Sequence, residues 1–500
     1  MTASKRFRIL AGILIFFAFL VVTAKLVDPD FYWHLRDGET ILSTHAVPRV
    51  DAYSFTMSGI PWVDHEWLIE GFIAWMWDHN LNAALAAIFA IVAFIPFVIW
   101  LRRYRTWPAL WAIAAAATLF ACFISVRPQV FSYLFFFIVY ELLSRYYGDG
   151  RDRGTRKKRY LAVLPIVFFL WANIHAEFFS GLVLFGIFLV TDIVVTAWPK
   201  KKIDWSGMPF SFGIFLVSAI VPLLNPYGAG LYGEIFRVMF SGNTMRYIQE
   251  WKSPFAGQAT FSPLTIAIAA LVSFFILIVI KYYKRITPTA LAAGVIFFAL
   301  FAKATRMGPL FAIAAVPLIA EGFGYVHADL SPRWHLASRR TKRIFLWLGI
   351  AVSIAAFCLI TITPATLAAT QYPVGATVFL NAEVAQGKNI ILLNNYDWGG
   401  YLIWNAPEIK IFVDGRMPHW IAPNGTSAMG DYIRLLLSPV DAEGRQIILD
   451  KWSINTVLLP SPATDNNAAD DGLVNQLTAA GWITGYQDSV AIVLQRPAGQ

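Results

Sequence analysis

Residues 28–34 read Asp28-Pro29-Asp30-Phe31-Tyr32-Trp33-His34, directly after the first long apolar run of the chain. A second acidic motif follows in the same loop and reads Trp62-Val63-Asp64-His65-Glu66-Trp67. Acidic residues at the end of an apolar segment are costly to place in lipid and usually face a cavity or a substrate. The two motifs therefore predict a site that handles a polar substrate at a membrane surface.

The composition is that of a polytopic membrane protein. The chain has 500 residues, of which 57% are hydrophobic and 14% are charged, whereas soluble domains are about 45–50% apolar and about 25% charged. The net charge of +9 comes from short basic clusters between apolar runs, which is the positive-inside pattern and not a nucleic-acid footprint. Both cysteines, Cys122 and Cys358, lie inside apolar runs, so neither a disulfide framework nor a zinc motif is expected.

The apolar runs predict about eleven transmembrane helices, because a helix needs about 20 apolar residues to cross a bilayer. The expected spans are 7–27, 80–101, 108–125, 129–147, 159–175, 178–198, 208–224, 262–281, 287–303, 308–322 and 344–364. The first run lacks a small-residue cleavage motif and is expected to remain as a helix.

The basic clusters orient these spans. With a cytoplasmic N-terminus, every strong basic cluster falls on the cytoplasmic side. The long first loop, 28–79, and everything after about residue 365 then lie outside the cytoplasm. The predicted location is the plasma membrane, in bacteria the inner membrane.

The expected fold class is a mainly α polytopic membrane protein with a C-terminal extracytoplasmic α/β domain. We expect a transmembrane domain over 1–365, which includes the loop 28–79, and a soluble domain over 366–500. Helices are expected near 35–45, 67–79, 427–437, 443–451 and 472–480. Strands are expected at 389–393, 401–404, 410–413, 456–459 and 490–494.

Asp28 and Asp30 flank a proline, which fixes the local backbone in an extended turn. Two carboxylates so close together can act as a base and its orienting partner or share a metal ion. They can equally be polar residues that face water at the end of a helix. The same choice applies to His34, Asp64, His65 and Glu66: acids beside aromatic rings suit sugar recognition, and they also suit a loop packed on the membrane surface.

Cations on the same side of the membrane predict an anionic ligand. They are Arg127, His175, Arg246, Lys303 and Arg306, and Asn173 and Glu177 flank His175. Arginine gives a phosphate bidentate contacts. Any one of these residues alone is equally compatible with a side chain that snorkels to the membrane interface. In the C-terminal domain Asp397, Tyr401, Asp414 and Arg416 are candidate loop residues, and each is also compatible with a tight turn.

The layout resembles the GT-C superfamily of polytopic glycosyltransferases. The resemblance rests on the Asp28-Pro29-Asp30 motif after the first span, on the long first loop with its second acidic motif, and on the external C-terminal domain. Several segments also resemble an uncharacterised bacterial branch: 28–34, 62–67, 173–178, 225–228, 397–401 and 414–416. The chain carries Asp-Pro-Asp where the protein mannosyltransferase and lipid A aminoarabinose transferase branches carry an Asp-Glu pair.

This resemblance implies transfer of a sugar, with inversion, from a polyprenyl-phosphate-linked donor to a glycan, lipid or protein acceptor. Asp30 or Asp28 would be the general base, and Asp64 and Glu66 would position the acceptor or a metal. Some branches use a divalent cation such as Mg²⁺ or Mn²⁺ and others do not, and the sequence leaves this open.

Two other classes of function compete with the enzyme. One is a transporter or flippase of a lipid-linked or anionic substrate, and the other is an envelope assembly protein without chemistry. Transporters often show repeated halves and charges deep in their spans. In this sequence the halves do not repeat and the polar motifs gather at one membrane face, which favours the enzyme.

Overall fold

The computed structural model describes residues 5–24, 28–148, 157–200, 207–256, 263–334, 372–436, 442–462 and 468–497. The chain divides into two compact units. Unit 1 comprises residues 1–25, 82–231 and 249–363, and unit 2 comprises residues 26–81, 232–248 and 364–500. The contacts thus group the first loop with the C-terminal region, whereas the sequence placed that loop with the spans.

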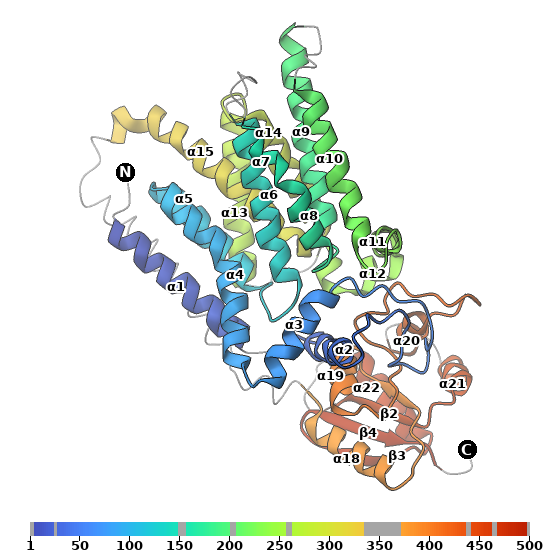
Figure 1. Cartoon of the computed structure of the whole chain (residues 1–500). Coiled ribbons are helices and arrows are strands. Elements are labelled where there is room, and N and C mark those ends of the chain that lie inside the picture. Colours follow the sequence, from blue (N-terminus) through green and yellow to red (C-terminus); the bar gives the residue numbers. More distant parts are fainter. Residues whose placement is uncertain are drawn as a thin grey trace. The chain divides into compact units, whose positions relative to one another are not determined.

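Unit 1 is helical throughout its described part. Its helices are α1 (Lys5–Ala24), α4 (Asn82–Arg103), α5 (Trp107–Ala121), α6 (Gln129–Tyr147), α7 (Arg159–Ala162), α8 (Leu164–Ala172), α9 (Phe178–Lys200), α10 (Met208–Ile220), α13 (Pro263–Tyr282), α14 (Pro288–Lys303) and α15 (Gly308–Trp334). Short 3-10 turns lie at Val221–Leu224, Gln249–Trp251 and Thr305–Met307. Helices α5, α6, α13 and α14 lie in one bundle (Figure 1), and α15 packs on α5, α13 and α14.

Each predicted span up to residue 322 overlaps one of these helices or a helix and its adjoining turn, except that 159–175 covers the two helices α7 and α8. The predicted span 344–364 lies outside the described residues. Among the described residues, five helical segments are long and apolar enough to cross a membrane: Lys5–Ala24, Asn82–Arg103, Phe178–Val195, Thr265–Tyr282 and Thr305–Val326. The structure therefore confirms a mainly helical protein with helices that can span a membrane, while the count of about eleven spans stays a prediction.

Small residues and exposed apolar side chains explain how unit 1 is built. Helix α5 buries Ala112, Ala115 and Ala116 where it packs on α13 and α15, and small residues let helices approach closely in a membrane. Large apolar side chains such as Val190 and Ile280 are exposed on the outside of the bundle, where an aqueous surface would disfavour them.

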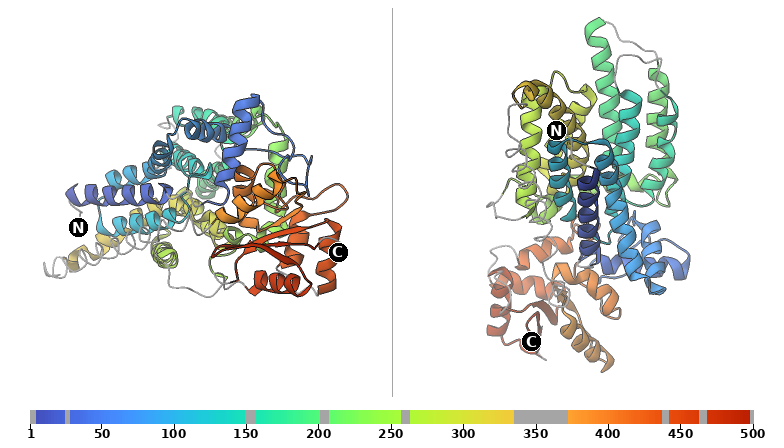
Figure 2. Two further views of the ribbon diagram at one scale, coloured as in Figure 1. Left: turned by 90° about the horizontal axis from the view of Figure 1, so that it is seen from below. Right: turned by 90° about the vertical axis from the view of Figure 1, so that its left-hand side faces the viewer.

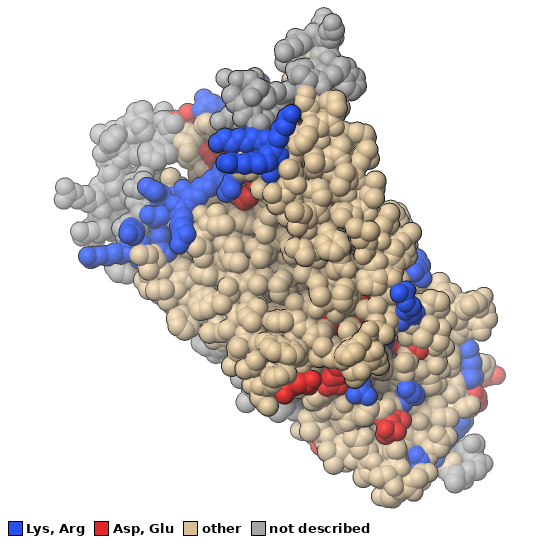
Figure 3. All heavy atoms as spheres, in the orientation of Figure 1, with Lys and Arg blue, Asp and Glu red and all other residues tan. Residues whose placement is uncertain are grey.

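Lysines and arginines gather at the end of unit 1 where α4 ends and α5 begins (Figure 3). Arg103 of α4 and Arg145 of α6 both pair there with Glu141, each at 3.2 Å. This clustering of cations at one end of a helical bundle is the spatial form of the positive-inside pattern.

Unit 2 combines a small sheet with short helices. Its helices are α2 (Phe31–Thr44), α3 (Trp67–Asp78), most of α11 (Gly230–Phe240), α12 (Gly242–Tyr247), α18 (Val374–Ala385), α19 (Gly399–Asn405), α20 (Ala428–Leu436), α21 (Ala442–Lys451) and α22 (Ala468–Ala479). Its strands are β1 (Leu392–Asn394), β2 (Thr456–Pro460), β3 (Ile483–Gln487) and β4 (Ala491–Gln495), and a 3-10 turn lies at Tyr396–Trp398.

The sheet has the strand order β1-β2-β4-β3. β1 pairs with β2 in parallel, with Leu392 opposite Thr456, and the other pairings are antiparallel. Helices α18 and α22 pack on it (Figure 2). β2 and β4 are almost fully buried, which explains why their continuous apolar runs were readable as strands.

Two of the strand predictions were wrong. Residues 401–404 lie in helix α19 because Tyr401, Leu402 and Ile403 are all buried, which a half-buried strand does not allow. Residues 410–413 form only an isolated bridge, between Ile411 and Ser54 of the first loop. Strand β3 and helix α18 were missed. β3 is an exposed edge strand, so it lacks the apolar alternation that marks a strand.

Candidate functional site

The Asp28-Pro29-Asp30 motif forms a turn that leads into helix α2. Asp30 N donates a hydrogen bond of 3.0 Å to Asp28 Oδ1, and Trp33 Nε1 donates one of 3.0 Å to Asp30 Oδ1. The Tyr372 hydroxyl donates to the Asp28 carbonyl oxygen at 3.0 Å. Both carboxylates are half-buried. Asp30 is therefore held in a fixed direction and is still within reach of solvent.

Two glycines of the C-terminal region let this turn pack closely. A Cβ on Gly415 would lie 2.1 Å from Asp30 Oδ1, and a Cβ on Gly400 would lie 2.5 Å from the Pro29 carbonyl oxygen. Only glycine permits such an approach of one backbone segment to another. Three motifs that are far apart in the sequence, 28–34, 397–401 and 414–416, thus meet within unit 2.

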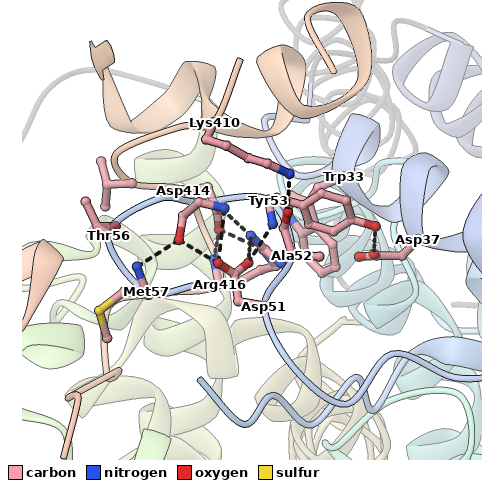
Figure 4. A network of polar contacts seen from close by, with 12 residues as sticks. Trp33, Asp37, Asp51, Ala52, Tyr53, Thr56, Met57, Lys410, Asp414 and Arg416 are labelled. Carbon is pink, nitrogen blue, oxygen red and sulfur yellow. Dashed lines mark hydrogen bonds and ion pairs between the residues drawn. The ribbon is translucent and has the colours of Figure 1, made fainter. Parts of the chain in front are cut away.

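Arg416 forms the centre of a buried ion network (Figure 4). Its guanidinium Nη2 lies 2.6 Å from Asp414 Oδ2 and 2.9 Å from Asp51 Oδ1. The rings of Tyr53, Trp62 and Trp420 surround it at 4.8 to 5.4 Å. Burial alone would lower the pKa of Arg416, but Asp414 and Asp51 raise it above its usual range, so this cation is permanently charged.

The acids next to this network have unusual pKa values. Burial raises the pKa of Asp64 to about 6. The pKa of Asp37 is also raised by burial, and the Tyr53 hydroxyl donates to its Oδ1 at 2.6 Å. Burial, with the charges of Asp64 and Asp37 added, raises the pKa of Glu70. These shifts follow from the cost of keeping charge in a dry interior.

His34 joins helices α2 and α3. Its Nδ1 lies 2.7 Å from Glu70 Oε1 and 3.6 Å from Glu66 Oε2, and Glu66 N donates to Asp64 Oδ1 at 3.1 Å. One imidazole nitrogen and two carboxylate oxygens lie within 4.8 Å of one another. This set of side chains has the composition of a metal site.

Four members of this cluster were not predicted: Asp37, Asp51, Tyr53 and Glu70. The sequence does hold a signal for Glu70, because it is an acid in the first turn of a largely apolar helix, four residues after Glu66 and so on the same face. Asp51 and Tyr53 carry no such signal, since their partner Arg416 is more than 360 residues away.

Unit 1 contains a separate polar cluster. Glu250 lies between two arginines, at 3.3 Å from Arg306 Nη1 and 3.8 Å from Arg127 Nη1. Burial disfavours the charged form of Glu250, but Arg306 and Arg127 outweigh it and lower its pKa. The arginine side chains are 15% and 26% exposed. They are therefore cations that an anionic ligand can reach.

His175 lies beside a second set of partners in unit 1. Its Nδ1 is 2.9 Å from Ser132 Oγ, which accepts a hydrogen bond of 2.7 Å from Trp171 Nε1. Glu177 lies 4.0 Å away and is buried, and burial raises its pKa to about 7. A carboxyl group with this pKa can hold or release a proton near neutral pH.

The remaining candidates are placed less centrally. Lys303 and Arg246 are exposed, and the Arg246 guanidinium lies 5.5 Å from the ring of Tyr247. His65 is half-buried, with Nδ1 at 3.3 Å from the Val63 carbonyl oxygen. Asp397 is exposed, and its backbone N–H donates to Asn395.

Tyr401 belongs to an aromatic cluster behind the Asp28 turn. Its ring stacks on Tyr372 at 4.8 Å and meets Tyr32 edge-on at 5.2 Å. The structure therefore brings Tyr401, Asp414 and Arg416 together with the first loop, and it gives them packing and ion-pair roles there.

No protein-family model and no curated protein matches this sequence. Solved structures do match its fold. An oligosaccharyltransferase of Archaeoglobus fulgidus, tethered with an acceptor peptide, aligns with a TM-score of 0.52 at 11% identity, over 99% of this chain and 75% of that chain. The oligosaccharyltransferase AglB of the same organism, in complex with an inhibitory peptide and a dolichol-phosphate, aligns at 0.50 and 12% identity over 91% of this chain and 70% of that chain.

A third match extends over almost the full length of both proteins. ArnT from Cupriavidus metallidurans, bound to undecaprenyl phosphate, aligns with a TM-score of 0.50 and 11% identity over 99% of each chain. At these identities the likeness concerns the fold. These neighbours are GT-C glycosyltransferases, and the predicted resemblance is confirmed at the level of the fold.

Proposed function

We propose that this protein is a membrane glycosyltransferase that moves a sugar from a polyprenyl-phosphate-linked donor to an acceptor hydroxyl or amide. The observation that carries the proposal is the position of Asp30. In a chain of GT-C fold, it follows the first helix directly, is held by Trp33 and Gly415, and remains half-buried. A general base needs this combination of fixed direction and access to its substrate.

Asp30 is the base in this proposal, and Asp28 positions it. The Asp28 carboxylate accepts the backbone N–H of Asp30 and so shapes the turn. Asp30 removes the proton of the acceptor, whose heteroatom attacks the anomeric carbon. The bond from this carbon to the phosphate oxygen breaks, and the configuration at the carbon inverts.

The departing lipid phosphate needs cations. Arg127 and Arg306 are assigned this role because they are partly exposed and share one carboxylate, Glu250. Both guanidinium groups are partly exposed beside Glu250, so a phosphate can reach them. Stabilising a developing oxyanion in this way is usually a large part of catalysis. His175 and Lys303 are further candidates for phosphate contact. Arg246 is also a candidate, supported only by its exposure.

The proposed topology follows the charge distribution. The arginine-rich end of unit 1 faces the cytoplasm, with the N-terminus on the same side. The first loop and the region from 366 to the C-terminus then lie outside the cytoplasm, where the lipid-linked donor is used. Neighbours of the same fold carry dolichol-phosphate or undecaprenyl phosphate, which supports a lipid-phosphate carrier here.

The test is transfer of labelled sugar from a polyprenyl-phosphate pool to endogenous acceptors in membranes. Asp30→Asn is expected to lower transfer by at least about 100-fold, in the range of general base catalysis, and Asp28→Asn by less. Glu408→Gln is the matched control, because Glu408 is an exposed carboxylate of unit 2. Expression and monodispersity of all variants are checked in detergent.

Full transfer in Asp30→Asn would remove this residue from the chemistry. No transfer by the wild type, from a donor pool that a known transferase can use, would favour the transporter or the assembly protein over the enzyme.

A further inference from the structure

A cavity opens at the basic end of unit 1, where helices α4 and α6 end (Figure 3). Its volume is about 450 Å³, and the residues that line it are Ile99, Arg102, Arg103, Glu141 and Arg145. Four of these five side chains are charged, and three of the four are arginines. None of them has a role in the transfer reaction proposed above, so the cavity needs a separate explanation.

Glu141 is a buried carboxylate, only 4% exposed, that holds two of these arginines in place. Arg103 Nη1 donates to Glu141 Oε1 and Arg145 Nη2 donates to Glu141 Oε2, each at 3.2 Å. The Arg103 and Arg145 side chains are nevertheless 53% and 52% exposed, and Arg102 is exposed as well. The arginines are therefore oriented from below and still present N–H donors to a ligand, and arginine matches the oxygens of a phosphate with such donors.

An apolar stripe leads away from the cavity along α4. Ile91, Ile95 and Ile99 are spaced four residues apart, so they lie on one face of the helix, and this face also carries Arg102, three turns after Ile91. Ile91 is 49% exposed, and Ile95 and Ile99 are half-buried. The acyl chains of a lipid can cover this stripe while its phosphate meets the arginines, whereas a water-soluble phosphate compound would leave the stripe uncovered.

We propose that this cavity binds the headgroup of an anionic phospholipid, with the acyl chains along the isoleucine stripe of α4. Basic pockets between membrane helices suit the phosphates of anionic lipids. Three arginines favour a headgroup that carries phosphate without an ammonium group, and so they favour cardiolipin over phosphatidylethanolamine. The inference rests on residues of unit 1 alone, and it does not depend on the proposed transfer activity.

The bound lipid would stabilise the ends of several helices. Its phosphate offsets the mutual repulsion of the arginines at the ends of α4 and α6. Helix α1 is tied to the same place, because Arg8 Nη1 donates to the Leu101 carbonyl oxygen at 2.7 Å. A ligand that binds only the folded protein raises its stability, so cardiolipin is expected to raise the unfolding temperature of the protein.

The test is cardiolipin binding by the full-length chain, delipidated in a neutral detergent and followed by native mass spectrometry. At the tightest site, Arg102→Gln is expected to bind about fivefold more weakly than the wild type and Arg102→Gln/Arg145→Gln about 25-fold, since each arginine near a phosphate contributes about a factor of five. Arg105→Gln is the matched control, because it removes the same charge close by from an exposed residue that does not line the cavity. It should bind like the wild type, since solvent screens a charge that does not contact the phosphate.

Measurements on the wild type alone cover the case in which the double variant does not fold. The wild type should bind cardiolipin at least about tenfold more tightly than phosphatidylethanolamine, and glycerol phosphate at the concentration of the lipid should not displace it. Equal affinity for the two lipids, or displacement by glycerol phosphate, would overturn the proposal. Equal weakening by Arg105→Gln and Arg102→Gln would also overturn it, because the attraction would then be a property of the whole basic surface and not of the cavity.

Discussion

The polar clusters of the two units differ in the mix of their charged groups. In unit 1, two arginines, Arg127 and Arg306, share Glu250. In unit 2, a single arginine faces several carboxylates. In the proposed transfer reaction, cations would meet the phosphate and a carboxylate would serve the acceptor. These two kinds of group lie in different parts of the chain.

The clusters also differ in access. Arg306 and Arg127 are 15% and 26% exposed, whereas the Arg416 side chain is 1% exposed. A partly exposed arginine can exchange its carboxylate partner for a ligand, and a buried arginine with two partners cannot do so without leaving them unpaired. Residues that the sequence ranked together as candidates therefore separate into partly exposed residues and buried ones.

The largest effect is expected from Arg416→Ala. This change leaves Asp51 and Asp414 buried without a cation, and breaking a buried pair from one side costs about 3–5 kcal/mol. The midpoint of thermal unfolding in detergent should fall strongly, or the protein should fail to accumulate.

Arg434→Ala is the control, because Arg434 is exposed on α20 of the same unit. It should unfold at nearly the wild-type temperature. Equal unfolding temperatures for Arg416→Ala and Arg434→Ala would contradict the structural role of Arg416.

Gly415→Ala tests whether the C-terminal region holds Asp30 in place. The new Cβ would lie 2.1 Å from Asp30 Oδ1, so either the carboxylate or the backbone must move. We expect a loss of stability of about 1–3 kcal/mol, as for other overpacked sites, and at least about tenfold lower transfer, since an angstrom of misplacement has large effects on rate.

Gly472→Ala is the matched control, since a Cβ there meets nothing closer than 4.0 Å and alanine favours a helix. It should leave both transfer and stability at or above the wild-type level. Unchanged transfer by Gly415→Ala would separate the C-terminal region from the chemistry.

The fold was largely readable from the sequence, for a physical reason. Segments such as 82–103 and 178–200 are long and largely apolar, so their signal is local. The strands at 456–460 and 491–495 were readable for the same reason, since both are buried within a short run.

The candidate site could be predicted from the sequence only in part. Asp30 was marked as an acid after a span, Glu66 as an acid beside a tryptophan, and Arg416 as part of an Asp-Gly-Arg turn. Their mutual contacts were not readable, because Asp51 meets Arg416 across 365 positions. Nor did the sequence separate Arg416 from Arg306, since exposure depends on the packing of the whole unit.

Glu250→Gln sharpens the comparison through pH. The pKa of Glu250 is lowered in the folded protein by Arg306 and Arg127, against the effect of burial. A lowered carboxyl pKa contributes stability that is present above the unfolded pKa, near 4.5, and that is lost as the pH falls through the folded value. The free energy of unfolding of the wild type should therefore exceed that of Glu250→Gln by about 1 kcal/mol at neutral pH.

This advantage should shrink as the pH falls below about 4.5. Unfolding temperatures of both proteins between pH 3.5 and 7 give the measurement. A difference that stays constant over this range would show that Glu250 acts through packing and not through its charge.

The smallest effect is expected from Tyr372→Phe. The change removes the hydrogen bond from the hydroxyl to the Asp28 carbonyl oxygen, at 3.0 Å, and keeps the ring stacked on Tyr401 at 4.8 Å. A single neutral hydrogen bond is worth about 0.5–1.5 kcal/mol, so the unfolding temperature should fall by only a few degrees. Tyr283→Phe, at an exposed tyrosine of unit 1, should not change the unfolding temperature.

The same variant also tests the turn that presents Asp30. Because Asp28 shapes this turn, the rate of sugar transfer by Tyr372→Phe should fall by a larger fraction than the free energy of unfolding does. If transfer stays at the wild-type level while the stability loss is measured, the turn is positioned by its glycine contacts and the hydroxyl contributes to folding alone.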